Sequence, residues 1–279
     1  MSVDKIEKLL KFLPPEDYVL DSLKDEKVWF SYLKNLNDPF EGNVRFSKLE
    51  REEVINVFLE VVTSKGAIAP AELPEYRKAL EIDGHYDGLV EAIGEIEKDT
   101  VRNIMETFSA FSCCRVMSGS TVAERANEIL MWAHYTKSFR GLCIDFDFHV
   151  LDRSLRELNR DDAMDNELIS YEPEMCELDF PQFMRNAIKP HQVGMDDYIK
   201  TSILRKHSIW EYEKELRFLS GREGLFNISN EAIKGVYLGP NMDEKYSEDV
   251  VDMFRSKFPY VKLYNVAPYG YGFNYKELK

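Results

Sequence analysis

The order of apolar and polar residues along the chain predicts helices in blocks and strands in runs. Helices are expected where apolar residues recur every three to four positions, and strands where they alternate or cluster between turn residues. The expected helices cover residues 3–13, 16–25, 49–65, 86–107, 122–135, 182–208 (with a break near Pro190) and 243–257. The expected strands cover residues 27–32, 108–116, 141–148, 213–220, 235–240 and 260–268, with strand-like pieces in 168–180.

This order predicts an α+β fold, because strands follow strands instead of alternating regularly with helices. We expect one domain over residues 1–279, with a mixed, largely antiparallel sheet core flanked by helices and a helical insertion or subdomain at about residues 49–107. The strand expected at 141–148 has the clearest alternation of the chain. Its one face is formed by Leu142, Ile144, Phe146 and Phe148, and its other face by Cys143, Asp145 and Asp147.

The composition is that of a globular chain, with 44% apolar and 31% charged residues. The net charge of −14 argues against general nucleic-acid binding, because phosphate contacts require a positive surface, although a compact nucleotide ligand remains compatible. No apolar run approaches the roughly 20 residues that span a bilayer, and the N-terminus has no signal-peptide core. We therefore expect a cytoplasmic protein without membrane association, whose four cysteines are free thiols and form no zinc site.

The segment WEYEKELRFL, residues 210–219, carries the first candidate site. If it is a strand throughout, Glu211, Glu213 and Glu215 share one face with Arg217. Side chains two residues apart on a strand lie about 7 Å from each other, so the carboxylates repel and the arginine offsets part of the repulsion. Such a cluster suits a site that holds a cation or an oxocarbenium-like transition state. The alternative is a solvated sheet face with an ordinary ion pair.

The segment NDPFEGN, residues 37–43, is the second candidate. Asn37 and Asp38 can each form an Asx turn, and the ring of Pro39 fixes its φ angle. These turns are expected to hold Phe40 against the core. A rigid structural turn and a ligand-binding loop both fit this pattern, because binding sites often lie on turns held by a scaffold.

The third candidate is MWAHYTKSFRG, residues 131–141. A capping box that starts at Thr121 predicts a helix running to about Tyr135. His134, close to the C-terminal end of that helix, either caps it through the helix dipole or lines a site together with Tyr135. Trp132 is expected in the core.

Taken together, the three segments resemble the bacterial domain of unknown function 2971 family. The resemblance rests on NDPFE, on MWAHY followed after five residues by glycine, and on W-x-YE-x-ELR, which occur jointly and in this order. The stretches FLPPEDYVLDSLKDEKVWFSYLKN, FSAFSCCRV, ISYEP and VYLGPNM extend it over nearly the whole chain. Residues 49–107 and 150–166 match poorly.

The layout is similar in outline to that of the ADP-ribosyltransferase superfamily, in which a split mixed sheet grips NAD and a glutamate on a late strand contacts the nicotinamide ribose. This similarity implies an enzyme that uses NAD as a substrate, in a defence or toxin-like setting. It implies Glu215 as the main catalytic residue and Glu213 as its partner, since several members carry a Glu-x-Glu pair. The His or Arg on the first strand of the superfamily has Lys11 or Lys24 as its counterpart here.

The same resemblance implies a set of substrate-binding residues whose side chains can stack on a ring, hydrogen-bond a ribose or pair with a phosphate. Tyr135, Trp132 or Phe40 would stack on nicotinamide, and Ser112 would hydrogen-bond the carboxamide or a ribose hydroxyl. The basic members would contact the pyrophosphate. The full set is His134, Tyr135, Asn37, Asp38, Phe40, Ser112, Lys206, Arg217 and Arg140.

Two other functions fit the same residues. A non-catalytic module would sense a nucleotide or a peptide at this site. A metal-dependent phosphodiesterase or nuclease would hold Mg²⁺ between Asp38, Glu41, Glu213 and Glu215, with Lys206 nearby. For the main interpretation we expect no tightly bound cofactor and no metal. The protein partner stays open.

Overall fold

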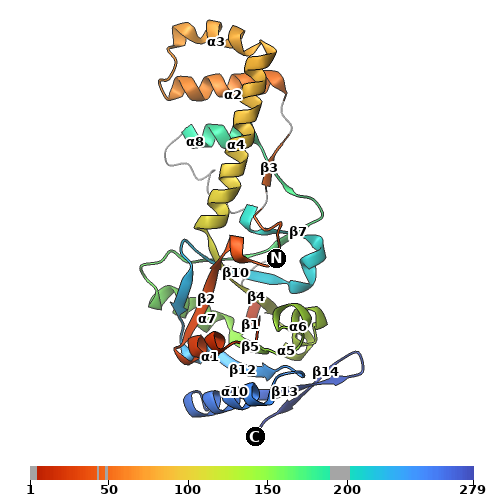
Figure 1. Cartoon of the computed structure of the whole chain (residues 1–279). Helices are drawn as coiled ribbons and strands as arrows, with labels where there is room; N and C mark the ends of the chain where they lie inside the picture. The colour runs from red at the N-terminus through yellow and green to blue at the C-terminus, as the bar shows by residue number, and fades with distance from the viewer. Residues whose placement is uncertain (1–4, 43, 48–49, 189–201) are drawn as a thin grey trace. The chain divides into compact units, whose positions relative to one another are not determined.

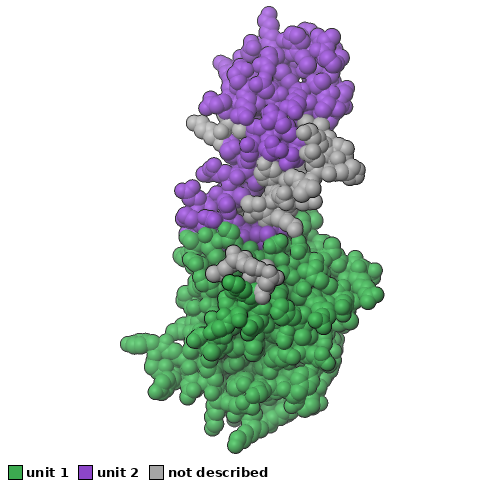
Figure 2. All heavy atoms as spheres, turned by 180° about the vertical axis from the view of Figure 1, so that it is seen from behind, with its two compact units in different colours: residues 1–35, 107–171, 208–279 green, residues 36–106, 172–207 purple. Residues whose placement is uncertain are grey.

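The chain folds into two units, each built from segments that are distant in the sequence. Unit 1 contains residues 1–35, 107–171 and 208–279, and unit 2 contains residues 36–106 and 172–207 (Figure 2). This computed structural model describes residues 5–42, 44–47, 50–188 and 202–279. The expectation of one domain over the whole chain stays a prediction.

Unit 1 is built on short strands with helices beside them (Figure 1). Its strands are β1 (Ile6–Leu13), β2 (Lys27–Tyr32), β4 (Ser109–Met117), β5 (Leu142–Asp147), β6 (Asp165–Leu168), β7 (Ser170–Glu172), β10 (Glu215–Ser220), β11 (Gly224–Asn227), β12 (Ile233–Leu238), β13 (Lys262–Tyr269) and β14 (Gly272–Glu277). Its α-helices are α1 (Asp17–Lys24), α5 (Val122–Ala126), α6 (Ile129–Tyr135), α7 (Phe148–Leu158) and α10 (Glu244–Lys257). Its 3₁₀ helices are η2 (Leu33–Asn35), η4 (Ser208–Glu213) and η5 (Asn230–Ala232).

Within the described part of the chain, a ten-stranded sheet forms the centre of unit 1. Its strand order is β11-β2-β4-β1-β5-β12-β13-β14, and β10 pairs with both β4 and β6. Strands β12 and β13 run parallel, and the other neighbours run antiparallel. The expected α+β fold, with a mixed and largely antiparallel sheet flanked by helices, is confirmed.

Helices cover both faces of this sheet. Helices α1, α7 and α10 contribute to a core that includes Leu9 and Ile144 on one face. Helices α5 and α6 pack on the opposite face, here called the α5–α6 face, in a second core that includes Leu10 and Phe12. The fully buried ring of Trp132 meets the Phe12 ring edge to face, with centroids 5.2 Å apart. The expected core position of Trp132 is confirmed.

Strand β1 replaces the helix that the apolar spacing predicted over residues 3–13, so that prediction is wrong. A bulge near the start of β1 shifts the phase of the strand by one residue. Ile6 and Leu9 therefore lie in one core, and Leu10 and Phe12 lie in the other. A bulged strand that is buried on both faces thus reproduces the three-to-four spacing of a helix.

The helix expected over residues 122–135 begins as predicted and breaks in the middle. Thr121 Oγ1 accepts a hydrogen bond from the Glu124 N–H at 3.1 Å, and the Glu124 carboxylate accepts one from the Thr121 N–H at 2.8 Å. The capping box is therefore confirmed. Helix α5 ends at Ala126, and Trp132 Nε1 of α6 donates to the Ala126 carbonyl oxygen at 2.7 Å, which ties the two short helices together.

After α6 the chain makes a left-handed turn before it enters β5. Lys137, Ser138 and Phe139 have positive φ angles of 48°, 60° and 70°. Each such L-residue costs about 1–2 kcal/mol, so neighbouring contacts must hold the turn. The Phe139 N–H donates to Thr136 Oγ1 at 3.1 Å, and the Gly141 N–H donates to the Thr136 carbonyl oxygen at 2.9 Å. The buried Thr136 thereby anchors both ends of the turn.

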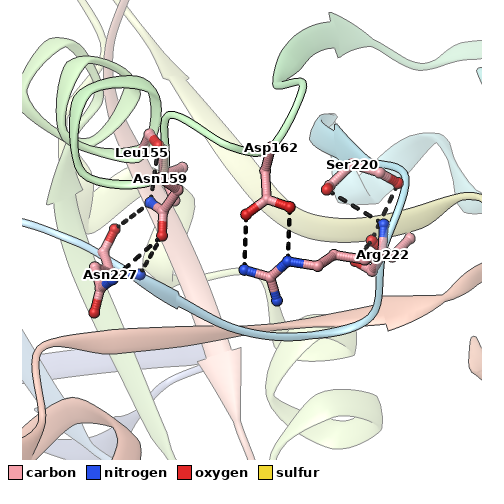
Figure 3. A network of polar contacts seen from close by, with 7 residues as sticks. Leu155, Asn159, Asp162, Ser220, Arg222 and Asn227 are labelled. Carbon is pink, nitrogen blue, oxygen red and sulfur yellow. Dashed lines mark hydrogen bonds and ion pairs between the residues drawn. The ribbon is translucent and has the colours of Figure 1, made fainter.

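Helix α7, which the sequence pattern did not predict, is fixed to β11 by the polar network shown in Figure 3. Asn159 Nδ2 donates to the carbonyl oxygens of Leu155 and Asn227 at 2.8 and 2.9 Å, and Asn159 Oδ1 accepts from the Asn227 N–H at 2.9 Å. Beside it, Arg222 and Asp162 form a two-point ion pair at 2.7 and 2.8 Å. These contacts hold the C-terminal end of α7.

Unit 2 is largely helical in its described part. Its elements are β3 (Val44–Phe46), α2 (Arg51–Ser64), η3 (Pro70–Glu72), α3 (Leu73–Leu80), α4 (Asp83–Thr107), β8 (Cys176–Leu178), α8 (Phe180–Ile188) and β9 (Arg205–His207). The helices expected over 49–65 and 86–107 are confirmed as α2 and α4. Strands β3 and β8 pair in parallel, and the ring of Phe46 packs against those of Phe180 and Phe183 at centroid distances of 5.0 and 5.2 Å.

Two further expectations in unit 2 change. No helix was expected between residues 65 and 86, but α3 forms there, because Pro74 lies in the first turn, where the helix needs no N–H from it. The helical prediction over 182–208 is confirmed for α8, which ends at Ile188, and is wrong at β9, which is a strand, while residues 189–201 lie outside the described part. Across the described ranges of both units, we find no helix with the length and apolar character that crossing a membrane requires.

Candidate functional site

The segment 210–219 is not one strand, which corrects the expectation that its odd-numbered residues share a face. Residues up to Glu213 form the 3₁₀ helix η4, and β10 begins at Glu215. Between them Lys214 has a positive φ angle of 46°, which turns the chain sharply. Its side chain pairs with Glu211 at 2.7 Å outside the sheet. The carboxylate of Glu213 is therefore presented from the end of η4, and that of Glu215 from the sheet.

Glu215 and Arg217 form a buried two-point ion pair on β10. Arg217 Nε donates to Glu215 Oε1 at 2.7 Å, and Arg217 Nη2 donates to Glu215 Oε2 at 3.3 Å. The two side chains are 0% and 4% exposed for the arginine and the glutamate. Such a pair contributes little net stability, since desolvation offsets the attraction.

The register of β4 and β10 places further side chains on the same face as this pair. Cys114 lies opposite Glu215, and Ser112 lies opposite Arg217. Directly opposite residues of an antiparallel pair project to the same side of the sheet. Because Cys114 belongs to the core under α5 and α6, the ion pair and Ser112 lie on the α5–α6 face. Lys11 Nζ donates to the Ser112 carbonyl oxygen at 2.7 Å.

Two tyrosines bind the segment around Glu213 and Glu215. The Tyr135 hydroxyl, from the end of α6, donates a hydrogen bond to Glu213 Oε1. The Tyr171 hydroxyl accepts one from the Glu215 N–H at 2.7 Å. Burial raises the pKa of Tyr171, so this phenol stays protonated. Glu213 and Glu215 are each 3% exposed, so each tyrosine hydrogen-bonds a buried glutamate.

Arg125 of α5 links this segment to the core. Its Nη2 donates to Cys114 Sγ and to the Tyr212 carbonyl oxygen, both at 3.0 Å. Burial raises the pKa of Cys114 although Arg125 opposes this shift, so the side chain remains a thiol and donates to the Glu213 carbonyl oxygen at 2.7 Å. All four cysteines are free, as the sequence predicted, and all four are buried.

An aromatic trio, defined as His134, Trp210 and Tyr212, lies next to the buried carboxylates. His134 Nδ1 and the Tyr212 hydroxyl are 2.9 Å apart and share a hydrogen bond. Ring centroids are 6.0 Å apart for each of the three pairs, with edge-on or tilted planes. His134 is therefore held by η4, and it remains exposed.

The expected residues of the NDPFEGN segment belong to unit 2. Asp38 Oδ1 accepts a hydrogen bond from the Phe40 N–H at 3.0 Å, which confirms the Asx turn expected at Asp38, while the one expected at Asn37 stays a prediction. The expectation that Phe40 packs against the core is wrong, because the turn closes through the backbone and leaves the ring 67% exposed. In the same unit Lys206 Nζ lies 3.9 Å from Glu41 Oε2, and both side chains are buried.

The expected site residues thus divide between the two units. In unit 1 the structure brings a group together around η4 and β10, and this group consists of Ser112, His134, Tyr135, Glu213, Glu215 and Arg217. Arg140 is also in unit 1, exposed after the left-handed turn. The expected residues in unit 2 are Asn37, Asp38, Phe40 and Lys206.

Sequence reasoning missed four residues that build the unit 1 group, namely Arg125, Tyr171, Trp210 and Tyr212. Trp210 and Tyr212 stand in the W-x-YE motif, and Tyr171 stands in ISYEP, so a signal was present for three of them. Arg125 follows an ordinary capping box, and no pattern in the sequence marks it. Over the described ranges, we find no group of three or more His, Cys, Asp and Glu side chains arranged to hold a metal ion.

A separate buried carboxylate, Asp145, lies on β5 on the α5–α6 face. Its side chain is 7% exposed, and Lys8 Nζ lies 3.5 Å from its Oδ2. Its Oδ1 has no hydrogen-bond partner among the described residues. Burial raises the pKa of Asp145 from its ordinary value of 3.8 to about 6, although Lys8 lowers it in part.

Asp145 is expected to make the free energy of unfolding depend on pH. The folded state holds this proton more tightly than the unfolded state, so stability is highest below pH 4, falls as the pH rises to about 6 and is level above that. The shift corresponds to roughly 2–3 kcal/mol. Asp145→Asn should therefore be more stable than the wild type at pH 8 and should lose this dependence, as urea unfolding between pH 4 and 8 would measure. Replacing the exposed Glu7 by Gln is the control, and an unchanged profile for Asp145→Asn would contradict the assignment.

Residues 131–218, about a third of the chain, match a family described as a protein of unknown function, DUF2971. The matched segment begins in α6 and ends in β10, so it contains the aromatic trio and the Glu213 to Arg217 segment. This match supports the resemblance noted from the sequence for that part of the chain. Comparisons with curated proteins and with solved structures find no match.

Proposed function

We propose that the protein uses NAD as a substrate and transfers its ADP-ribose group at the unit 1 site around Glu213 and Glu215. The observation that carries the proposal is that two buried carboxylates, Glu213 at the end of η4 and Glu215 on β10, lie next to an aromatic trio in which His134 is exposed and Trp210 and Tyr212 are half-buried. Small-molecule sites combine an apolar, ring-bearing wall with a few convergent polar groups. Carboxylates held away from water stabilise positive charge more strongly than exposed ones do.

In the proposed reaction the bond between nicotinamide nitrogen and the ribose C1′ breaks, and its electron pair leaves with the nicotinamide. The ribose then carries the positive charge of an oxocarbenium ion, which the Glu215 carboxylate stabilises. An acceptor nucleophile attacks C1′, and its proton passes to the Glu213 carboxylate. Tyr135 acts as a positioning residue, since its hydroxyl orients Glu213.

The test is nicotinamide release from NAD with water as the acceptor, followed by chromatography, together with mass spectrometry for transfer to protein. Glu215→Gln is expected to lower the rate at least about 100-fold, because a neutral amide cannot stabilise the cation. The control is Glu211→Gln, on the neighbouring 3₁₀ helix η4, whose exposed carboxylate pairs with Lys214 and whose loss should leave the rate unchanged. Thermal unfolding of each variant separates lost chemistry from lost structure. Nicotinamide release by Glu215→Gln at the wild-type rate would overturn the proposal.

A second candidate is a module that binds a nucleotide without reaction. The observation that favours it is that Glu215 is already paired at two points with Arg217, and that Glu213 already accepts a hydrogen bond from Tyr135. Saturable binding of NAD without any product in the same assay would select this alternative.

A further inference from the structure

We propose that the aromatic trio of His134, Trp210 and Tyr212 binds the planar heterocycle of a nucleotide, with Trp210 as the main stacking residue. This inference rests on the proposed function in one respect, because it assigns the base-binding part of the same site. Trp210 was not among the ligand contacts expected from the sequence.

The geometry of the trio supports ring binding. The planes of the three pairs are inclined by 73°, 74° and 43°, so none of the pairs is stacked face to face. The hydrogen bond between His134 and Tyr212 fixes two of the rings relative to each other, so they need no ordering when a ligand arrives. Aromatic side chains held in this way bind bases through stacking, which tolerates any base with a flat π surface.

The surroundings favour one nucleotide over a longer nucleic acid or a peptide. The net charge of −14 disfavours binding of a long nucleic acid, because its many phosphates would be repelled. The base of a single nucleotide is uncharged and meets no such repulsion at the trio. Leu130, one helical turn before His134, is 43% exposed and extends the apolar surface. Tyr135 and Glu213 directly follow His134 and Tyr212 in the chain, so a ligand stacked on the trio has its sugar close to that hydrogen-bonded pair.

The test measures binding of AMP, nicotinamide mononucleotide and ribose 5-phosphate to the full chain by calorimetry and by tryptophan fluorescence. AMP or nicotinamide mononucleotide is expected to bind and quench the fluorescence, and ribose 5-phosphate is expected to bind at least about tenfold more weakly. Trp210→Ala should weaken nucleotide binding about tenfold or more, and Trp210→Phe should restore most of it because a ring remains. Trp29→Phe, which changes an exposed tryptophan outside the trio, is the control.

Three results would overturn the inference: wild-type nucleotide affinity in Trp210→Ala, equal binding of ribose 5-phosphate and AMP, or no binding of either nucleotide at about 10 mM. The outcomes separate this inference from the proposed function. If Trp210→Ala turns over NAD with an unchanged KM, the stacking role of Trp210 is wrong and the proposed enzyme activity stands. If nucleotide binding depends on Trp210 but the wild type releases no nicotinamide, the proposed enzyme activity is wrong and the stacking role stands.

Discussion

Replacing Arg217 by Met is expected to lower the free energy of unfolding by about 3–5 kcal/mol, because it leaves the Glu215 carboxylate buried without its cation. The arginine is fully buried and contacts both carboxylate oxygens of its partner. Urea unfolding at pH 7 measures the effect. The loss should shrink at lower pH, where the orphaned carboxyl group can bind a proton.

The double variant Glu215→Leu with Arg217→Met is the informative companion. Apolar residues of similar size remove both desolvation penalties, so the double variant should recover most of the stability lost in the single variant. The exposed pair of Glu211 and Lys214 serves as the matched control, and Glu211→Gln should leave the free energy of unfolding close to the wild-type value. A single variant within about 1 kcal/mol of the wild type would show that the pair is not buried in solution.

Replacing Gly141 by Ala is expected to destabilise the protein by about 3 kcal/mol or more, or to prevent folding. A Cβ atom at this position would lie 1.9 Å from the carbonyl oxygen of Leu13 and 3.0 Å from the Cβ of Thr136. Because Leu13 is the last residue of β1 and pairs with β5, the backbone itself would have to move. Thermal or urea unfolding of the purified variant checks this expectation.

Gly221→Ala provides the control for that experiment. No atom lies within 4 Å of the Cβ position at Gly221, and its backbone does not require a positive φ angle, so its substitution should leave stability close to the wild-type value. Equal stability of the two alanine variants would contradict the close approach at Gly141. The expected difference also gives a physical reason for the glycine that follows MWAHY after five residues: the left-handed turn returns the chain directly onto the end of β1.

Structural elements could be predicted from the sequence where they depend only on residues close together in the chain. The strand 27–32 and the capping box at Thr121 depend on neighbours within a few residues, and the sequence predicted both. The helix predicted over 3–13 failed because burial on both faces and a bulge imitate helical spacing. The left-handed turn escaped prediction because non-glycine residues adopt positive φ only when surrounding structure imposes it.

The candidate site follows the same division. Glu215 and Arg217 could be placed on one face of a strand from their two-residue spacing, and that part is confirmed. The sequence did not show that Glu213 lies outside this strand. The strand starts only after Lys214, whose positive φ angle turns the chain, and no glycine marks that turn in the sequence. The contacts of Tyr171 and Arg125 join residues from distant segments, and a single sequence holds no information on such pairings.

The division of the chain into interleaved segments sets an order in which the units can be completed during synthesis. Both segments of unit 2 precede residue 208, so a ribosome delivers all of unit 2 before the last segment of unit 1. Until residues 208–279 emerge, β4 and β6 lack β10, and β5 lacks β12. The nascent chain therefore carries unpaired strand edges in unit 1 while unit 2 is already complete, and this is the stage at which chaperones are most useful to it.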